Sequence, residues 1–372
     1  MAIGDITGQI RILVVDDSAF MRKALTMMLE SDPMIKVIGT ARDGEEGIEK
    51  VRHLKPDLVT MDIEMPRMDG LAALRQIMKT TPVPVMMISS LTTDGARATL
   101  DALEMGAVDF IPKALSYVSL DIVKIKDELL AKIKDIVRRK AILMSRFHLR
   151  SSSRSAGSAS ATARTSDLSR PQPGSARSLR KRDHHVEIVV IGSSTGGPPA
   201  LQEIVPRLPR NFPVGILIAQ HMPPMFTASL AERLDGLSQV TVREARDGDS
   251  VEAGTVLIAP GGQHLTVRKY GARATVRISP LPAETLYHPC VDVTMNSVAE
   301  AYLRTTLGVI LTGMGNNGVH GLQAIKDKGG MVIAQNEQTC VVYGMPRAAI
   351  EAGIADIIVP ITDVANEIVS FF

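Results

Sequence analysis

A serine and a histidine, each placed directly after a short apolar run, are the residues of this chain best suited to catalysis. Ser194 lies in the segment Gly-Ser-Ser-Thr-Gly-Gly, which follows the β-branched run 186–191. Such a run predicts a buried strand that turns sharply into a helix, because glycine admits backbone angles that side chains forbid. The G-x-S-x-G pattern is typical of a turn that projects a serine hydroxyl and leaves the next N–H free for an oxyanion. Phosphate-binding turns and plain connections use similar strings.

A serine hydroxyl needs an adjacent base, which a third group must orient. His221 directly follows the predicted strand 214–220 and should emerge beside Ser194. His264 and His288 are alternatives. The glycine-rich turn 312–318 can supply the third group and a second backbone donor for an oxyanion hole.

Alternating strands and helices must position these residues. Val186 to Phe372 predicts a second α/β domain, whose glycine-rich turns gather on the edge that carries Ser194. The predicted strands are 186–191, 214–219, 255–259, 307–311 and 357–359, and the predicted helices are 226–234 and 292–302.

The first part of the chain, residues 10–140, repeats a strand and a helix five times and predicts a doubly wound parallel sheet. Its strands are expected at 11–15, 36–39, 57–61, 83–88 and 108–111. Polar residues stand at successive strand ends, where such sheets gather function. Three carboxylates on one edge repel one another unless a hard cation such as Mg²⁺ lies among them. A single acidic residue at a strand end is better explained as a solvated helix cap. Polar residues at four successive strand ends are not explained in this way. These residues are Asp16, Asp17, Asp62, Ser89 and Lys113.

Composition supports two globular domains joined by a linker. The 372 residues are 45% hydrophobic with a net charge of +2, which implies no general attraction to nucleic acid or membrane. An amphipathic helix is expected over 122–136, and the Ser- and Arg-rich stretch 148–185 predicts a flexible linker. Two unpaired cysteines, no signal peptide and no apolar run of about 18 residues predict a cytoplasmic protein without membrane insertion.

Residues 10–140 resemble a response-regulator receiver domain, with Asp16, Asp17, Asp62, Ser89 and Lys113 at family positions. The resemblance implies that Asp62 accepts a phosphoryl group from a histidine kinase. It implies Mg²⁺ held by Asp17, Asp62 and the backbone carbonyl of Glu64, with Ser89 as the switch hydroxyl and Lys113 on the phosphate. Lys113-Ala114 departs from the family's lysine-proline pair, in which the proline assists a cis bond.

Residues 186–372 resemble the chemotaxis protein-glutamate methylesterases. The matching segments, in family order, are Gly-Ser-Ser-Thr-Gly-Gly, Gln-His-Met-Pro, His-Pro-Cys-Val-Asp-Val, Leu-Thr-Gly-Met-Gly-Asn and Gly-Met-Pro-Arg. The resemblance implies Ser194 as nucleophile, His221 as base and the N–H groups of Thr195 and Met314 as oxyanion hole. It implies hydrolysis of glutamate γ-methyl esters on methyl-accepting chemoreceptors, deamidation of receptor glutamines, and no cofactor in this domain. The unphosphorylated receiver would cover the site until Asp62 is phosphorylated.

Asn317 stands where the family has the triad aspartate. An aspartate would orient the imidazole through its Nδ1–H, whereas an asparagine can accept through oxygen or donate through nitrogen and hold the wrong tautomer. In a serine protease the same change lowers turnover about 10⁴-fold. Inactivation, natural or engineered, is one interpretation. Others are a carboxylate from another segment such as Asp247 or Asp249, tolerance of the asparagine, deamidation of Asn317-Gly318, and a simple turn without a catalytic role.

Two functions from different classes follow. One is a phosphorylation-activated ester hydrolase, and the other is a signalling module that binds receptor or kinase without catalysis. A receiver joined to a DNA-binding domain is disfavoured, because the second half has no helix-turn-helix segment or basic recognition helix.

Overall fold

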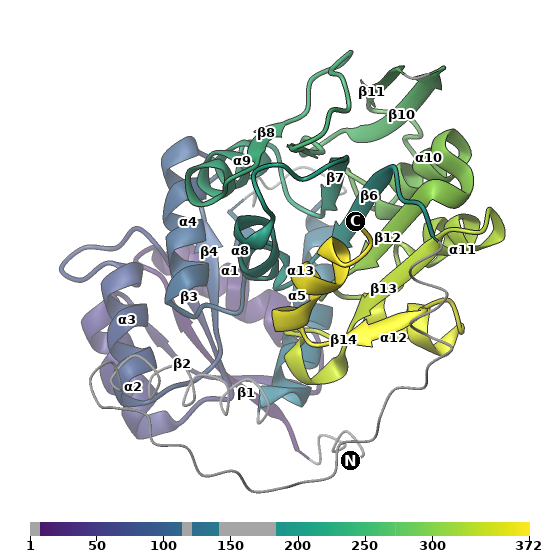
Figure 1. Ribbon diagram of the computed structural model, residues 1–372. Coiled ribbons are helices and arrows are strands. Elements are labelled where there is room, and N and C mark those ends of the chain that lie inside the picture. The colour runs from purple at the N-terminus through teal and green to yellow at the C-terminus, as the bar shows by residue number, and fades with distance from the viewer. Residues whose placement is uncertain (1–7, 114–120, 141–183, 272) are drawn as a thin grey trace, which may run out of the picture.

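The computed structural model describes residues 8–113, 121–140, 184–271 and 273–372. Two parallel sheets, each covered by helices on both faces, account for most of them (Figure 1). The linker expected over 148–185 lies, up to residue 183, outside the described residues, as does Ala114.

The first sheet has five parallel strands in the order β2-β1-β3-β4-β5. Helices α1 and α5 pack on one face, whereas α2, α3 and α4 pack on the other. The amphipathic helix expected over 122–136 is confirmed by α5, which buries Leu129, Ile133 and Ile136. The elements are β1 (Ile10–Val15), α1 (Ala19–Leu29), β2 (Ile35–Ala41), α2 (Gly44–Leu54), β3 (Leu58–Asp62), α3 (Gly70–Thr80), β4 (Val85–Ser89), α4 (Thr93–Met105), β5 (Asp109–Pro112) and α5 (Asp121–Arg138).

The second sheet has seven parallel strands in the order β14-β13-β12-β6-β7-β9-β8. Helices α8, α9 and α13 cover one face, and α10, α11 and α12 cover the other together with the antiparallel hairpin β10–β11. The elements are β6 (Ile188–Ser193), α8 (Gly197–Ile204), β7 (Gly215–Gln220), α9 (Phe226–Leu237), β8 (Thr241–Glu244), β9 (Thr255–Ile258), β10 (His264–Tyr270), β11 (Arg273–Ser279), α10 (Val291–Tyr302), β12 (Thr306–Ile310), α11 (Val319–Asp327), β13 (Met331–Gln335), α12 (Met345–Glu351), β14 (Ile357–Val359) and α13 (Ile361–Val369).

Register in the second sheet brings three turns together. Ser193 pairs with Gln220, and Gly192 pairs with Ile310, so β6, β7 and β12 end side by side. The chain leaves β6 for β7 on one side and returns to β12 on the other. This is the switch point at which parallel sheets place their ligands.

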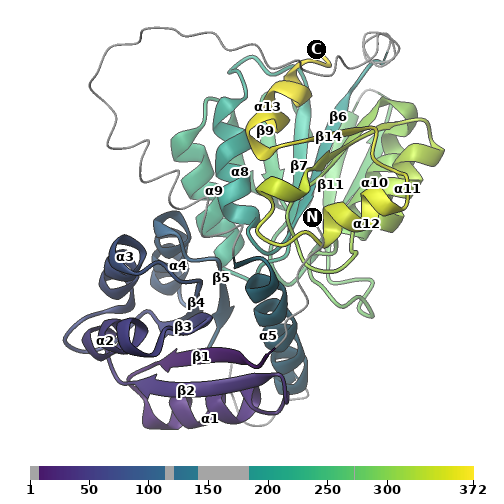
Figure 2. The same cartoon turned by 90° about the horizontal axis from the view of Figure 1, so that it is seen from below.

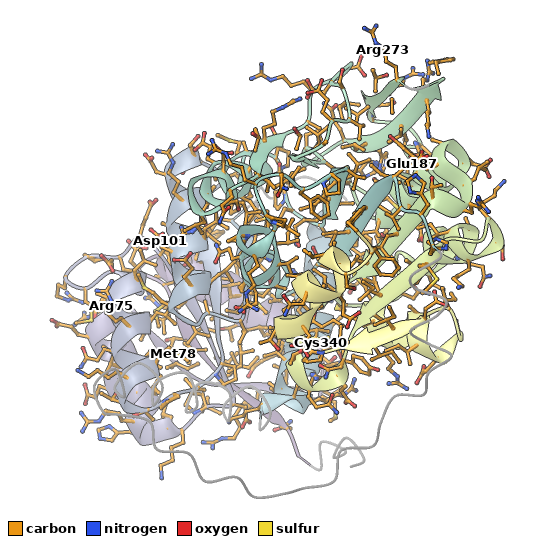
Figure 3. The ribbon with its side chains drawn as sticks, in the orientation of Figure 1. Arg75, Met78, Asp101, Glu187, Arg273 and Cys340 are labelled. Atoms are coloured by element: carbon orange, nitrogen blue, oxygen red, sulfur yellow. The ribbon has the colours of Figure 1, made fainter. Side chains whose placement is uncertain are left out.

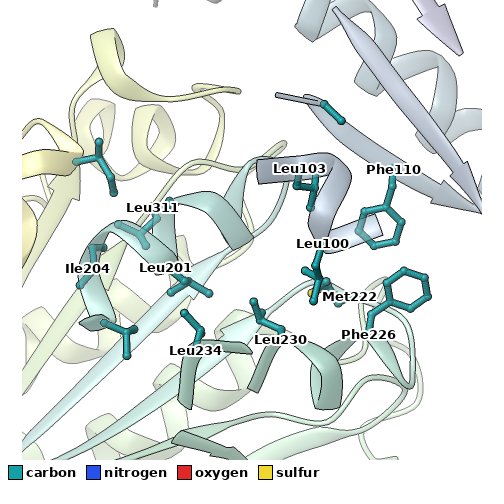
Figure 4. Packing of buried hydrophobic residues seen from close by; sticks show 14 of the residues in the cluster. Leu100, Leu103, Phe110, Leu201, Ile204, Met222, Phe226, Leu230, Leu234 and Leu311 are labelled. Atoms are coloured by element: carbon teal, nitrogen blue, oxygen red, sulfur yellow. The ribbon is translucent and has the colours of Figure 1, made fainter. Parts of the chain in front are cut away.

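The two domains share one apolar core. Leu100 and Leu103 of α4 belong to the same buried cluster as Met222, Phe226 and Leu230 of the second domain (Figure 4). At its edge the ring of Phe110, from β5, stacks on Phe226 with centroids 4.7 Å apart. Figure 2 shows α4, β5 and α5 as the elements of the first domain that face the second domain. Burial of aromatic and leucine side chains is the main stabilising term of such a contact.

The predicted doubly wound sheets are confirmed, and most predicted strands lie within two residues of the observed ones. Strands β8 and β13 and the hairpin β10–β11 were not predicted from the sequence. The hairpin is antiparallel and lies outside the parallel sheet, so the repeating strand-helix pattern does not predict it. No helix among the described residues is both long and apolar enough to cross a membrane.

Candidate active site

The turn after β6 presents Ser194 at the switch point. Its backbone N–H donates to Thr312 O at 3.0 Å, and Gly197 N–H donates back to Ser194 O at 2.8 Å. Gly196 has φ +75, and a Cβ there would lie 2.5 Å from the side chain of Val341. Both the backbone angle and the close approach therefore require glycine. Ser194 is 8% exposed and borders a cavity.

His221 bridges Ser194 and Asn317. Its Nδ1 lies 3.1 Å from Ser194 Oγ, and its Nε2 lies 2.9 Å from Asn317 Oδ1. The expected ring orientation, with Nδ1 toward residue 317, is therefore wrong. The backbone N–H of His221 donates to Ser193 O at 3.1 Å, which holds the nearer ring nitrogen beside the serine turn and lets Nε2 reach residue 317. The ring of Tyr287 stacks on His221 at a centroid distance of 4.1 Å.

Asn317 presents its oxygen to the histidine. Oδ1 also accepts from Val291 N–H at 2.8 Å, whereas Nδ2 donates to Asp292 Oδ2 at 2.8 Å and approaches Cys290 Sγ at 3.1 Å. An oxygen can only accept, so Nε2 of His221 carries the proton and Nδ1 accepts from Ser194. Of the two orientations open to an asparagine, the structure has the one that suits a base.

The other candidates for base and third group have partners other than Ser194, although His288 lines the cavity beside it. His264 is fully buried, where its Nδ1 accepts from Cys290 N–H and its Nε2 lies 3.1 Å from Pro282 O, and burial lowers its pKa. His288 packs on His264 with ring centroids 4.4 Å apart. Asp249 pairs with Arg243, and Asp247 accepts from Ile278 N–H at 2.8 Å. Neither aspartate supplies the carboxylate near His221, since both follow the edge strand β8 and contact the separate strand β11.

Gln220 and Gly313 support the nucleophile turn, and sequence reasoning did not assign them. Gln220 is buried, and its Nε2 donates to Ser194 O at 2.9 Å while its Oε1 accepts from Ser193 Oγ at 2.6 Å. A Cβ on Gly313 would lie 2.8 Å from Ser194 Cβ. The turn that carries Met314 therefore comes so close to Ser194 that only glycine fits at position 313. Thr195 and Met314, expected as oxyanion donors, thus lie on the two segments that flank the hydroxyl.

The cavity beside Ser194 has a volume of about 180 Å³ and is shared between the domains. Asp109, Phe110 and Lys132 of the first domain form part of its wall. Asp109 Oδ2 accepts from Thr195 Oγ1 at 2.9 Å and lies 3.0 Å from Lys132 Nζ. The first domain therefore holds a residue of the expected oxyanion hole directly.

The strand ends of the first sheet form an acidic pocket. Oxygens of Asp16, Asp17 and Asp62 lie within 4.8 Å of one another, and Lys113 Nζ lies 2.6 Å from Asp62 Oδ2 and 3.6 Å from Asp16 Oδ2. Burial raises the pKa of Asp62 to about 6, more than Lys113 lowers it, and burial also raises the pKa of Asp16. Burial lowers the pKa of Lys113, but the hydrogen bond and charge of Asp62 outweigh it, so the net change is upward.

This pocket fits a hard divalent cation. Asp16 Oδ2 is a buried oxygen that accepts no hydrogen bond within the described residues. Asp17 is exposed and lines an open hollow together with Glu64, so that an ion has a path of entry. All the available ligands are oxygens, which Mg²⁺ prefers.

Ser89 lies at the end of β4, but its side chain faces α4. Its Oγ donates to Gly95 O at 3.1 Å and accepts from Thr99 Oγ1 at 2.7 Å. Its backbone carbonyl accepts from the N–H of Lys113, a residue of the pocket, at 2.6 Å. The hydroxyl therefore links the end of β4 to the first turns of α4.

We expect Asp62→Asn to raise the free energy of unfolding at neutral pH without Mg²⁺. The pKa of Asp62 rises from 3.8 to about 6 in the folded state, so the proton on Asp62 stabilises the folded protein. This stabilisation is complete below about pH 4 and is lost as the pH rises through about 6. Above that range the buried charge costs about 3 kcal/mol. Calorimetry at pH 7.5 and 5.0 should find a larger rise in Tm for Asp62→Asn at pH 7.5, and Mg²⁺ should stabilise only the natural protein. The exposed Asp127→Asn is the control, and equal behaviour of both variants would contradict the assignment.

Fold and site together define a class of protein, a receiver-type acidic domain joined to an α/β serine hydrolase. Residues 12–122 match the response regulator receiver domain model, and residues 189–368 match the CheB methylesterase model. Protein-glutamate methylesterase/protein-glutamine glutaminase 1 of Oleidesulfovibrio alaskensis is 53% identical over 97% of this chain and 99% of its own. Protein-glutamate methylesterase/protein-glutamine glutaminase 2 of Nitratidesulfovibrio vulgaris is 52% identical, also over 97% of this chain and 99% of its own. The chain therefore belongs to the protein-glutamate methylesterase/protein-glutamine glutaminase family.

Among solved structures, the Thermotoga maritima CheB methylesterase catalytic domain is 45% identical to this chain. It covers 50% of this chain and 99% of its own, with a TM-score of 0.49.

Proposed function

We propose that this enzyme hydrolyses γ-methyl esters of glutamate, and deamidates glutamine, on cytoplasmic segments of methyl-accepting chemoreceptors. The observation that carries the proposal is the continuous line from Ser194 Oγ through His221 to Asn317 at the switch point of the second sheet. A histidine kinase is the proposed phosphodonor of the first domain, and the cytoplasm is the proposed location. No role for nucleic acid follows from either domain.

In the proposed mechanism His221 Nδ1 takes the proton of Ser194 Oγ as the oxygen attacks the ester carbonyl. The carbonyl oxygen becomes an oxyanion, which the N–H groups of Thr195 and Met314 stabilise. Collapse breaks the carbon–oxygen bond, and the imidazolium returns its proton to the departing methoxide, releasing methanol. Water then hydrolyses the acyl-serine by the same steps. With glutamine, ammonia replaces methanol.

The orientation of the Asn317 amide supports catalysis. Its oxygen accepts from His221 Nε2, so the base keeps the tautomer that Ser194 requires. The alternative is a protein that binds receptor or kinase without catalysis, which the lost charge at position 317 favours and the amide orientation opposes.

Regulation by the first domain is supported by the contacts across the cavity. Asp109 holds Thr195, and Phe110 lies against Phe226, so a receptor helix cannot approach Ser194 from this side while the domains are closed. Arg233 of α9 pairs with Asp101 Oδ1 of α4 at 2.6 Å and also with Glu104. Opening the site therefore requires α4 and β5 to leave the second domain.

Ser89 supplies a physical route from the acidic pocket to this contact. A phosphoryl group on Asp62, held by Lys113 with Mg²⁺ on Asp17, Asp62 and the Glu64 carbonyl, adds oxygens that a nearby hydroxyl can bond. The Ser89 hydroxyl would then give up its hydrogen bonds with Gly95 and Thr99 and donate one to the phosphate. That exchange weakens the anchoring of α4, the helix that carries Asp101 and Glu104.

The direct test is methanol release from methylated receptor, with and without a small-molecule phosphodonor and Mg²⁺. We expect stimulation of the natural protein and none of Asp62→Asn, which keeps the basal rate because Asp62 does not line the cavity beside Ser194. An equal response of both proteins would contradict control through Asp62. No release under any condition would instead favour the binding module.

Breaking the α4–α9 ion pairs should raise basal activity. Arg233→Glu replaces two attractions by repulsion, and each surface pair contributes up to about 1 kcal/mol, which predicts a rise of about 10-fold. Arg75→Glu on α3 is a matched reversal on the side of the first domain away from the second (Figure 3). If both variants keep the basal rate of the natural protein, these pairs do not hold the site closed.

A further inference from the structure

We propose that Asp292 is a positioning residue that, through Asn317, completes the hydrogen-bond line of the active site. The proposal rests on the proposed function for its kinetic consequences, but the orientation it predicts for His221 does not. Asp292 lies in the His-Pro-Cys-Val-Asp-Val segment, which sequence reasoning used only as a family signature.

Two helix ends hold the Asp292 carboxylate. It is in the first turn of α10, and its Oδ1 accepts from Gly321 N–H, in the first turn of α11, at 2.8 Å. Helix N-termini favour an anionic side chain. A Cβ on Gly321 would lie 2.4 Å from Met295 Cβ, so glycine is what lets α11 come this close to α10. With Oδ1 used in this way, Oδ2 is directed at Asn317 Nδ2, 2.8 Å away.

Asp292 and Val291 together exclude the reversed amide of Asn317. Reversal would place Nδ2 against Val291 N–H, a donor against a donor, and Oδ1 against the Asp292 carboxylate, an acceptor against an acceptor. The reversed amide would also donate to Nε2 of His221, which leaves the ring proton on Nδ1, the nitrogen that faces Ser194. Asp292 and Val291 thus together select the tautomer that an asparagine alone leaves open.

Asp292 also places a negative charge at the end of the hydrogen-bonded series Ser194, His221 and Asn317. An aspartate at 317 would stabilise the imidazolium directly, whereas here the carboxylate lies one amide further away and polarises Asn317 toward His221. Asn317→Asp alone would then oppose two carboxylates at the present 2.8 Å contact, which a proton must relieve. Asn317→Asp with Asp292→Asn exchanges the two groups and keeps one acid and one amide.

The first test is the tautomer of His221, read from imidazole ¹⁵N shifts at a pH where the ring is neutral. A His221→Gln spectrum assigns the signal among the eight histidines. We expect protonation at Nε2 in the natural protein, and a loss of that preference in Asp292→Ala and Asp292→Asn. Asp327→Asn, an exposed change on α11, should leave the signal unchanged. An unchanged signal in both Asp292 variants overturns the proposal whether or not the protein hydrolyses esters.

The second test is a cycle of the single and exchanged variants, with Tm measured for each. Asp292→Asn should lower kcat by at least about 10-fold, with a small effect on KM, and by no more than the roughly 10⁴-fold that a wrong histidine tautomer costs a serine protease. The exchanged pair should recover activity above either single variant. Single losses that add in the exchanged pair would contradict a shared role. Should Asp292→Ala not fold, the nearly isosteric Asp292→Asn and the exchanged pair still decide the outcome.

Discussion

Ser194→Ala is expected to lower kcat for methyl-ester hydrolysis about 10⁶-fold, as loss of the nucleophile does in serine hydrolases. The Ser194 hydroxyl lies 3.1 Å from Nδ1 of His221, the proposed base. The side chain is small, so its removal leaves little empty volume and the free energy of unfolding should change by less than about 1 kcal/mol. Methanol release and a thermal melt measure the two effects.

Ser193→Ala is the informative control, because the sequence places two serines side by side in this turn. Ser193 Oγ is buried and donates to Gln220 Oε1, away from the histidine. Its loss removes one hydrogen bond, so we expect most of the activity to remain. The assignment is wrong if Ser194→Ala stays active or if Ser193→Ala is the inactive variant.

Asn317→Ala is the second large effect, with an expected loss in kcat of about 10⁴-fold. The variant removes the acceptor of His221 Nε2 and leaves Val291 N–H without its partner. The histidine then loses both its tautomer and its orientation. A simple turn residue would instead affect stability and leave kcat nearly unchanged.

The exposed neighbour Asn316→Ala controls for disturbance of the turn and should keep kcat. Peptide mass spectrometry of fresh and stored protein tests the deamidation alternative. Both amide atoms of Asn317 are hydrogen-bonded, so we expect slow cyclisation with Gly318 and activity in fresh protein. Activity that grows with storage, together with a deamidated peptide, would contradict this.

The sequence alone determined the two parallel sheets and the edges on which chemistry lies. Periodicity reveals strands and helices locally, and parallel sheets bring the carboxyl ends of strands to one edge. Ser194, His221 and the turn with Asn317 could therefore be grouped from the sequence. The same reasoning grouped Asp16, Asp62 and the other strand-end residues of the first sheet.

Only the tertiary structure decided how these groups meet. The choice of His221 over His264, the ring nitrogen that faces Ser194, and the carboxylate of Asp292 behind Asn317 all depend on contacts between segments 25 or more residues apart. The contact of Asp109 with Thr195 spans 86 positions. Sequence pattern reports which face of an element is apolar, whereas the direction of a hydrogen bond depends on where two distant backbones come to lie.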